Sequence, residues 1–120
     1  MTGRLPDYIN LHGTATLPND LVECRSIREV FRSDAGRIDC SSLKGGLGHL
    51  LGAAGSVELA ATALAIRDQV APPTVNLAEP DPECRLNLTP NKAKPSRIEH
   101  AWKISMGFGG HIAGACLGRL

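Results

Sequence analysis

Residues 40–68, CSSLKGGLGHLLGAAGSVELAATALAIRD, decide the fold of this 120-residue chain. Between Lys44 and Arg67 the only formally charged residue is Glu58, and the only other titratable group is His49. From about residue 50 the pattern predicts one helix that is apolar on nearly every side and therefore buried. A buried carboxylate needs a partner or a proton, and Lys44 and His49 are the nearest candidates for Glu58. Three ionisable groups at the start of a dry helix are typical of an active site.

Glycines at positions 45, 46 and 48 precede the predicted helix. Because glycine adopts backbone conformations that other residues avoid, this segment is predicted to be a loop whose amides can face a ligand. The small residues of the helix itself allow another backbone to approach closely.

Composition limits the chain to one domain, residues 1–120, and its 42% hydrophobic but only 3% aromatic residues predict a core of small aliphatic side chains. A net charge of +1 with scattered basic residues gives no sign of nucleic-acid binding. Without an apolar signal region or an uncharged run that could span a membrane, a cytoplasmic protein is predicted. The four cysteines form no CxxC pair, so no metal site is expected, and free thiols are favoured over disulfides.

His12 ends a predicted strand, residues 8–12, in which apolar and polar side chains alternate until Gly13. Functional groups of α/β folds lie at such C-terminal strand ends. The alternative is a histidine that is only hydrogen-bonded at the end of a strand, and the local pattern leaves both open.

A helix is predicted over residues 21–32, where Asp20 and Glu23 are spaced as a capping box. Cys40 precedes two serines, but a nucleophile elbow needs a sharp turn directly at the nucleophile, so Cys40 is predicted to be a buried strand residue. The catalytic alternative, a cysteine hydrolase using Cys40 and His12, requires the two side chains within hydrogen-bonding reach. The other predicted elements are strands over 37–42 and 86–88, an irregular proline-rich crossing over 70–83 and a solvated polar loop over 89–99.

The C-terminal end predicts a hairpin with a strand over 101–105, a tight turn over 106–110 and a return strand over 111–117. Glycines on both sides of Phe108 leave one aromatic ring at the tip. Either the ring fills a gap in the core, or the turn forms a mobile gate or a backbone-amide oxyanion site.

The stretches YINLHGTATLPNDLVE, SSLKGGLGHLLGAAGSVE, RDQVAPPTVNLAEPDPEC and SMGFGG follow one another along the chain. In this order and spacing they resemble the C-terminal part of the β-ketoacyl-acyl-carrier-protein synthases, the condensing enzymes of fatty acid and polyketide synthesis. The pattern HGT-x-T-x-x-x-D-x-x-E together with K-x-x-x-G-H-x-x-G-A-A-G is the most specific part. The resemblance implies an α/β fold, the incomplete C-terminal half of a thiolase-like fold, with a mixed β-sheet, packed helices and a buried Gly/Ala-rich helix.

The resemblance also implies a mechanism. In such enzymes a cysteine of the N-terminal half takes the acyl chain as a thioester. Two histidines, matched by His12 and His49, then assist decarboxylation of malonyl-acyl carrier protein and stabilise the enolate. The matching lysine and glutamate, Lys44 and Glu58, hold the histidines and balance charge. Substrate-binding positions are implied at Thr14 and Thr16, for the phosphopantetheine arm, at Phe108, the gating aromatic whose backbone amide joins the oxyanion hole, and at the neighbouring Gly109.

No cofactor is expected beyond the phosphopantetheine that carries the substrate on acyl carrier protein. The implied partners are acyl carrier protein and either the N-terminal ketosynthase half or a second ketosynthase subunit, in a dimer, with no nucleic acid and no membrane. The family's nucleophile motif has no counterpart here, so the chain is expected to be a fragment or half of a split enzyme and inactive alone. The alternative is a non-catalytic partner similar to a chain-length factor, or a degenerate remnant. Joint retention of four residues favours the enzyme: His12, Lys44, His49 and Glu58.

The chain departs from the family pattern around the gate. The usual GFGG-Thr-Asn continues here as His111 and Ile112, and Ile104 and Met106 stand for the usual Asn and Phe. These changes loosen the hydrogen bonding expected behind the gate and leave chain-length preference open. His111, a third histidine near the predicted site, is interpreted as a strand residue beside the turn.

Overall fold

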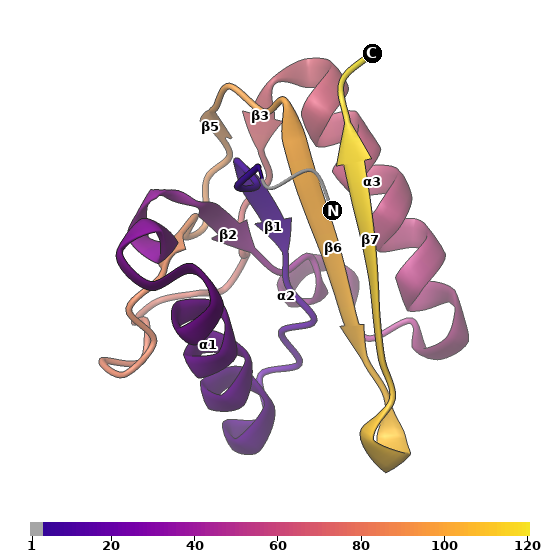
Figure 1. Ribbon diagram of the computed structural model, residues 1–120. Coiled ribbons are helices and arrows are strands. Elements are labelled where there is room, and N and C mark those ends of the chain that lie inside the picture. The colour runs from indigo at the N-terminus through magenta and orange to yellow at the C-terminus, as the bar shows by residue number, and fades with distance from the viewer. Residues whose placement is uncertain (1–3) are drawn as a thin grey trace.

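A five-stranded mixed sheet forms the centre of the computed structural model, which describes residues 4–120 (Figure 1). Its strands are β1 (Tyr8–Asn10), β2 (Asp39–Ser41), β4 (Asn87–Leu88), β6 (His100–Met106) and β7 (Ile112–Gly118). The strand order is β4-β2-β1-β6-β7, and every neighbouring pair is parallel except the antiparallel hairpin of β6 and β7. A second small sheet pairs β3 (Val70–Ala71) with β5 (Lys94–Pro95). The predicted mixed α/β fold is confirmed.

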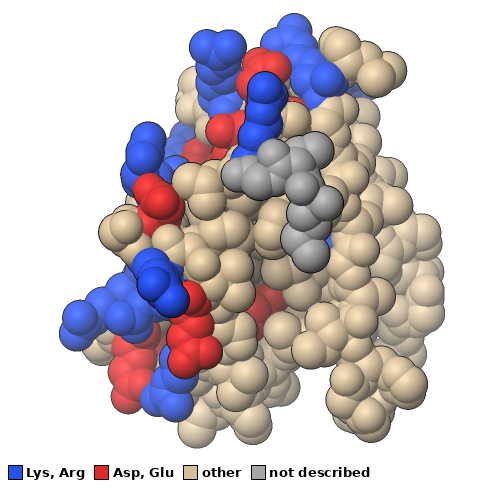
Figure 2. Space-filling view, in the orientation of Figure 1, with Lys and Arg blue, Asp and Glu red and all other residues tan. Residues whose placement is uncertain are grey.

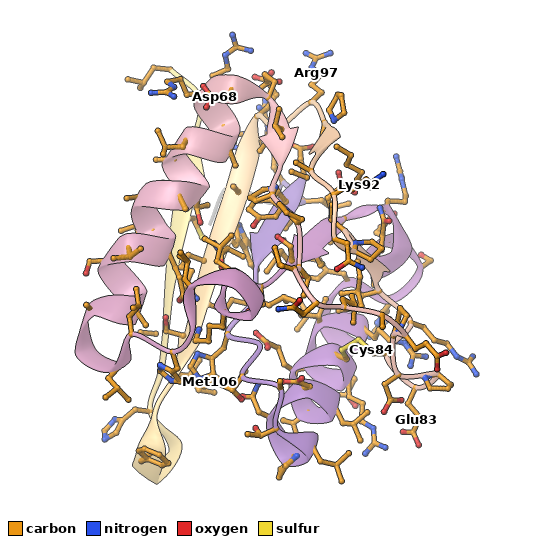
Figure 3. The ribbon with its side chains drawn as sticks, turned by 180° about the vertical axis from the view of Figure 1, so that it is seen from behind. Asp68, Glu83, Cys84, Lys92, Arg97 and Met106 are labelled. Carbon is orange, nitrogen blue, oxygen red and sulfur yellow. A yellow bond between two sulfur atoms is a disulfide. The ribbon has the colours of Figure 1, made fainter. Side chains whose placement is uncertain are left out.

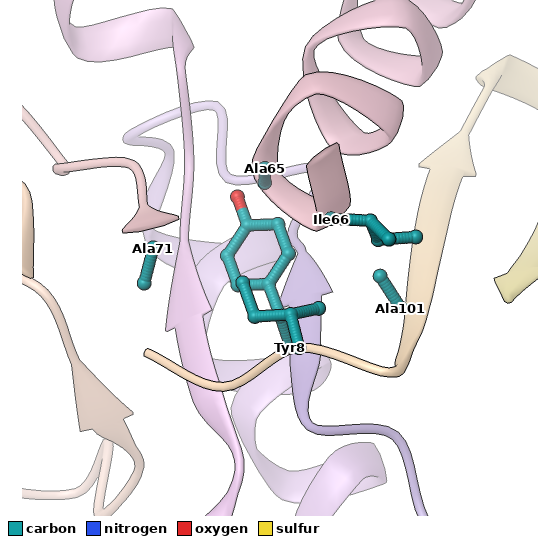
Figure 4. Packing of buried hydrophobic residues seen from close by; sticks show 6 residues of the cluster. Tyr8, Ala65, Ile66, Ala71 and Ala101 are labelled. Carbon is teal, nitrogen blue, oxygen red and sulfur yellow. The ribbon is translucent and has the colours of Figure 1, made fainter. Parts of the chain in front are cut away.

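Helices cover both faces of the large sheet. They are α1 (Leu17–Phe31), α2 (Lys44–Leu47) and α3 (Ala54–Asp68), with short 3-10 turns η1 (Arg32–Arg37), η2 (Leu51–Ala53) and η3 (Phe108–Gly110). Alternation along β1 separates two cores: Tyr8 packs with α3 and Ile9 packs with α1. Figure 4 shows the first core, where the ring of Tyr8 lies against the end of α3. Within residues 4–120, no helix is long and apolar enough to cross a membrane.

The C-terminal hairpin and the short strand near residue 87 are confirmed, but the start of α1 is not where the sequence predicted it. The helix begins at Leu17, with proline in its first turn, and the side chain of its N-cap, Thr16, makes no capping hydrogen bond. The predicted capping box is wrong because Glu23 points into the protein, where its carboxylate accepts backbone hydrogen bonds from His12 and Gly13.

The expectation of a fully buried α3 is also wrong. One face, with Ala54, Glu58 and Ala65, is buried, whereas Val57 and Leu64 are 40% and 47% exposed. The reason is that α3 packs on the large sheet with one face only. An apolar surface of α3 is therefore left open in this chain.

The glycine segment is not the loop that the sequence predicted. It forms the short helix α2, in which the amides of Gly46 and Gly48 donate to the carbonyls of Leu43 and Lys44. Gly45 is required for another reason, since a Cβ there would lie 2.1 Å from the carbonyl oxygen of Val75.

The segment 89–99, predicted to be a solvated loop, is partly built into the core. Ile98 is fully buried, and β5 carries Lys94, whose Nζ lies 2.6 Å from a carboxylate oxygen of Asp39. The sequence did not predict these contacts, because most residues of this segment are polar and only a few of them face the interior.

Cys24 of α1 and Cys84 form a disulfide, so the preference for free thiols over disulfides is wrong for these two cysteines (Figure 3). The two residues are 60 positions apart, and only the fold shows that the segment before β4 returns to α1. Cys40 and Cys116 are free, the first buried and the second exposed.

Loss of this disulfide is expected to lower the free energy of unfolding by about 2–4 kcal/mol, because the bond restricts a long loop of the unfolded chain. Denaturant unfolding of the chain with and without reductant, and of Cys84→Ser, measures the effect. Cys116→Ser is the matched control. Equal midpoints for Cys84→Ser and Cys116→Ser would contradict the disulfide.

Candidate active site

His12 and His49 approach each other beyond the C-terminal end of β1, the central strand of the sheet. His12 follows β1 and is 7% exposed, whereas His49 lies in the exposed segment after α2. Their ring centroids are 5.6 Å apart, with the planes at 84° in an edge-to-face arrangement. Two imidazoles from separate segments of the chain are therefore in contact. His49 is exposed to solvent, however, whereas the sequence predicted that it would be buried.

The hydrogen bonds around His49 fix its tautomer. The backbone amide of Leu51 donates to Nδ1 of His49 at 3.0 Å, so in the neutral ring the proton is on Nε2. For His12, burial lowers the pKa of the imidazole, and the nearby charges of Lys44 and Lys103 lower it further. His12 is thereby favoured as a neutral hydrogen-bonding group.

A buried ion pair is bound to the backbone of His12. Nζ of Lys44 lies 2.5 Å from Oε1 of Glu58, and both side chains are at most 5% exposed. The same ammonium donates to the backbone carbonyl of His12 at 2.6 Å. Burial would raise the pKa of Glu58, but hydrogen bonds and charge from Lys44 and Lys103 outweigh it and hold the pKa below its usual value. The pair thus ties α3 to the end of β1.

Two further charged residues of the site were not found from the sequence. Lys103 of β6 places Nζ 2.9 Å from Oε2 of Glu58, and Glu23 of α1 accepts the amides of His12 and Gly13 at 2.7 and 2.9 Å. Burial raises the pKa of Glu23, although its two backbone hydrogen bonds oppose the shift. A signal for Lys103 was present, because its strand position shares a face with Ala101.

A cleft of about 630 Å³ opens in front of the imidazoles. Thr14 and Thr16 line it, and their hydroxyls are hydrogen-bonded to each other at 2.8 Å. Phe108 lines it from the tip of the hairpin, where the ring is fully exposed. The other lining residues are His12, Asn19, His49, Leu51, Gly52, Met106 and Gly107.

Three other residues considered in the sequence analysis do not line this cleft: Gly109, His111 and Cys40. Gly109, in the turn after Phe108, has a φ of +77°, which favours glycine, but it does not line the cleft. His111 is exposed and also lies outside the lining. Cys40 is fully buried, its thiol donates to the carbonyl of Ile38, and burial raises its pKa, which removes the hydrolase alternative.

The geometry of the two histidines and the cleft is suited to stabilising an oxyanion. Neutral imidazoles are hydrogen-bond donors to an oxyanion, and a cleft in front of them leaves space for a substrate. In the described part of the chain, no three His, Cys, Asp or Glu side chains are grouped so that they could hold a metal ion. The two imidazoles and the cleft in front of them can present hydrogen-bond donors to an anion.

The sequence matches the family model of the β-ketoacyl synthase C-terminal domain over residues 5–78. The chain therefore belongs to the β-ketoacyl synthase family. It is 47% identical over 104 residues to 3-oxoacyl-(acyl-carrier-protein) synthase 2 of Coxiella burnetii, covering 87% of this chain and 25% of that protein. It is 45% identical over 118 residues to the tetracenomycin polyketide synthase ketoacyl synthase alpha subunit of Streptomyces glaucescens, covering 98% and 28%. The chain thus spans about a quarter of the length of these relatives.

Solved structures agree on the fold. The ishigamide ketosynthase/chain length factor superposes with a TM-score of 0.91 at 35% identity, covering 96% of this chain and 28% of that one. A type II polyketide synthase ketosynthase, solved in complex with its acyl-carrier protein, superposes with a TM-score of 0.87 at 39% identity, covering 92% and 27%. The chain has the thiolase-like fold of these ketosynthases and comprises part of it.

Proposed function

We propose that this chain supplies the histidine-bearing part of a β-ketoacyl-acyl-carrier-protein synthase, which condenses an acyl thioester with malonyl-acyl carrier protein and releases carbon dioxide. The observation that carries the proposal is the edge-to-face pair of His12 and His49, in which the buried ion pair of Lys44 and Glu58 is bound to the backbone of His12. Loss of carbon dioxide leaves an electron pair that is delocalised onto the thioester oxygen as an enolate. Imidazole N–H groups at that oxygen stabilise the developing charge.

The supporting residues act through the histidines. The Nε2 proton of His49 is free to be donated, because Nδ1 already accepts from Leu51. Lys44 holds the carbonyl of His12, and Glu23 holds its amide, so the backbone that carries this imidazole is fixed from both sides. We therefore assign the contact with substrate to the two histidines. Lys44 and Glu58 are assigned the roles of positioning the histidines and balancing charge.

The cleft fits a substrate carried on phosphopantetheine. Thr14 and Thr16 offer hydroxyls along one wall, as contacts for the amide-containing arm. We propose Phe108 as the gate and the turn with Gly109 as its hinge, because the ring is exposed at the hairpin tip and glycines flank it. The acyl carrier protein is the proposed delivering partner.

An N-terminal ketosynthase half, with the nucleophilic cysteine, is the proposed second partner, within a dimeric synthase. Its support is the open surface on the side of β6 and β7, which Figure 2 shows almost without charged residues. Exposed apolar side chains there and along α3 include Leu51, Val57, Leu64, Phe108 and Ile112. Apolar patches of this kind mark surfaces that another protein segment covers. The chain-length-factor alternative is not favoured, because the four site residues are kept together.

The proposal is tested in a hybrid synthase, in which residues 1–120 replace the matching segment of the Coxiella burnetii relative. We expect malonyl-dependent condensation by the hybrid synthase and none by the isolated chain. A correctly folded hybrid without condensation would contradict the proposal, and turnover by the isolated chain would contradict the need for an N-terminal half.

The condensation rate of the hybrid synthase is expected to fall at acid pH only below about 6.5. The reason is that the pKa of His12 lies below its ordinary value of 6.5, so the imidazole stays neutral down to that pH. Rates measured between about pH 5 and 8, with circular dichroism as a control for folding, test this. A rate that begins to fall well above pH 6.5 would contradict a neutral His12.

A further inference from the structure

Lys103 is a lysine in the interior of the protein, on a central strand of the sheet. Strand β6 lies between β1 and β7, where Lys103 pairs with Asn10 on one side and with Ala115 on the other. Its side chain is 3% exposed. An uncompensated ammonium in such a place would be strongly unfavourable, so its contacts must balance the charge.

The polar contacts of Lys103 connect it to Glu58 and to the residue before His12. Nζ lies 2.9 Å from Oε2 of Glu58, while Lys44 occupies the other oxygen of the same carboxylate. The ammonium also lies 3.5 Å from the carbonyl of Leu11, the residue before His12, and donates to the carbonyl of Ile104 on its own strand. One carboxylate is thus shared by two ammonium groups from two different elements.

We propose that Lys103 is a positioning residue of the condensing site: it completes a Lys44–Glu58–Lys103 cluster that fixes the end of β1 and keeps the imidazole of His12 uncharged. A second acidic side chain, Glu23, is buried on the α1 side, where it accepts the backbone amides of His12 and Gly13. Burial lowers the pKa of Lys103, and the hydrogen bond and charge of Glu58 oppose that shift.

The effect on His12 follows from the charges around it. The charged or titratable groups that face it are Lys44 of α2, His49, Glu58 of α3, Lys103 of β6 and Glu23 of α1. Lys44 and Lys103 both lower the pKa of His12, and their effect is larger than the opposing effect of Glu58. Removal of Lys103 takes away one of these two positive charges.

The test is a histidine titration by nuclear magnetic resonance on the 120-residue chain, with the ring signals of its four histidines assigned first. In Lys103→Met, the pKa of His12 is expected to rise by roughly 0.5 to 1 unit, because one nearby positive charge is lost. In Lys103→Arg, which keeps the charge, it is expected to stay near the wild-type value. His100, at the opposite end of β6 from the cleft, is the internal control.

A second comparison keeps the inference testable if Lys103→Met does not fold. Lys103→Gln removes the positive charge but keeps a side-chain amide that can donate to Glu58, and it is compared with Lys103→Arg, which keeps the charge. The pKa of His12 is again expected to be higher in the variant without the positive charge. An unchanged His12 pKa in either comparison overturns the inference. The inference rests on the proposed role of His12, but the titration does not measure catalysis, so its failure is distinguishable from absence of condensation by the hybrid synthase.

Discussion

Replacement of Glu58 by alanine is expected to lower the free energy of unfolding of the chain by about 3–5 kcal/mol, because it leaves two buried ammonium groups without their carboxylate. Lys44 and Lys103 are both nearly inaccessible to water and lie on opposite oxygens of Glu58. A loss of this size approaches the whole stability of a small domain. Denaturant unfolding followed by circular dichroism measures it.

The matched control is Glu29→Ala, an exposed glutamate on a helix of the same length, which is expected to change stability by no more than about 0.5 kcal/mol. The effect of Glu58 must also depend on pH. Because its folded-state pKa lies below the ordinary 4.5, its stabilisation is present above that pH and is lost as pH falls through the folded-state pKa. If Glu58→Ala and Glu29→Ala are equally mild, the buried ion pair does not support the site.

Replacement of His49 by alanine is expected to slow carbon dioxide release from malonyl-acyl carrier protein by about 10²–10³-fold in the hybrid synthase. One preorganised donor to an oxyanion contributes an effect of this size. Among residues 4–120, the hydrogen bond to the ring of His49 is the one from Leu51 to Nδ1, which leaves the Nε2 proton for the substrate. Carbon dioxide release is the informative assay because it reports the decarboxylation step apart from acyl transfer.

His111→Ala serves as the control for this substitution. His111 is exposed, is close in sequence to the gate and does not line the cleft, so its loss is expected to leave the rate within about twofold. His49→Gln retains an N–H donor and should lose less than His49→Ala. Equal rates for His49→Ala and His111→Ala would exclude His49 from the reaction.

Much of the fold could be predicted from local patterns. Alternation predicted β1, and the glycines around Phe108 predicted the C-terminal hairpin. The burial of α3 could not be predicted in this way, because a helix that is apolar on every side does not show which face will meet the sheet. The disulfide could not be predicted either, because the spacing of Cys24 and Cys84 in the sequence does not show whether the fold brings them together.

The candidate site was only partly predictable. His12, Lys44, His49 and Glu58 stood out through their motifs, and the structure brings them together, while their roles stay predictions. Glu23 was hidden because its spacing from Asp20 also suits a helix cap. Lys103 was hidden because a single lysine in a short strand is ordinarily placed at the surface.

The central claim is that His12 and His49 act together on one developing anion. The most direct test is the rate of carbon dioxide release by the hybrid synthase with His12→Ala, His49→Ala and both substitutions. Residues that act as a unit show non-additive losses, so the double variant is expected to be about as slow as the slower single variant. Losses that multiply fully in the double variant, or a single variant that keeps the wild-type rate, would contradict the claim.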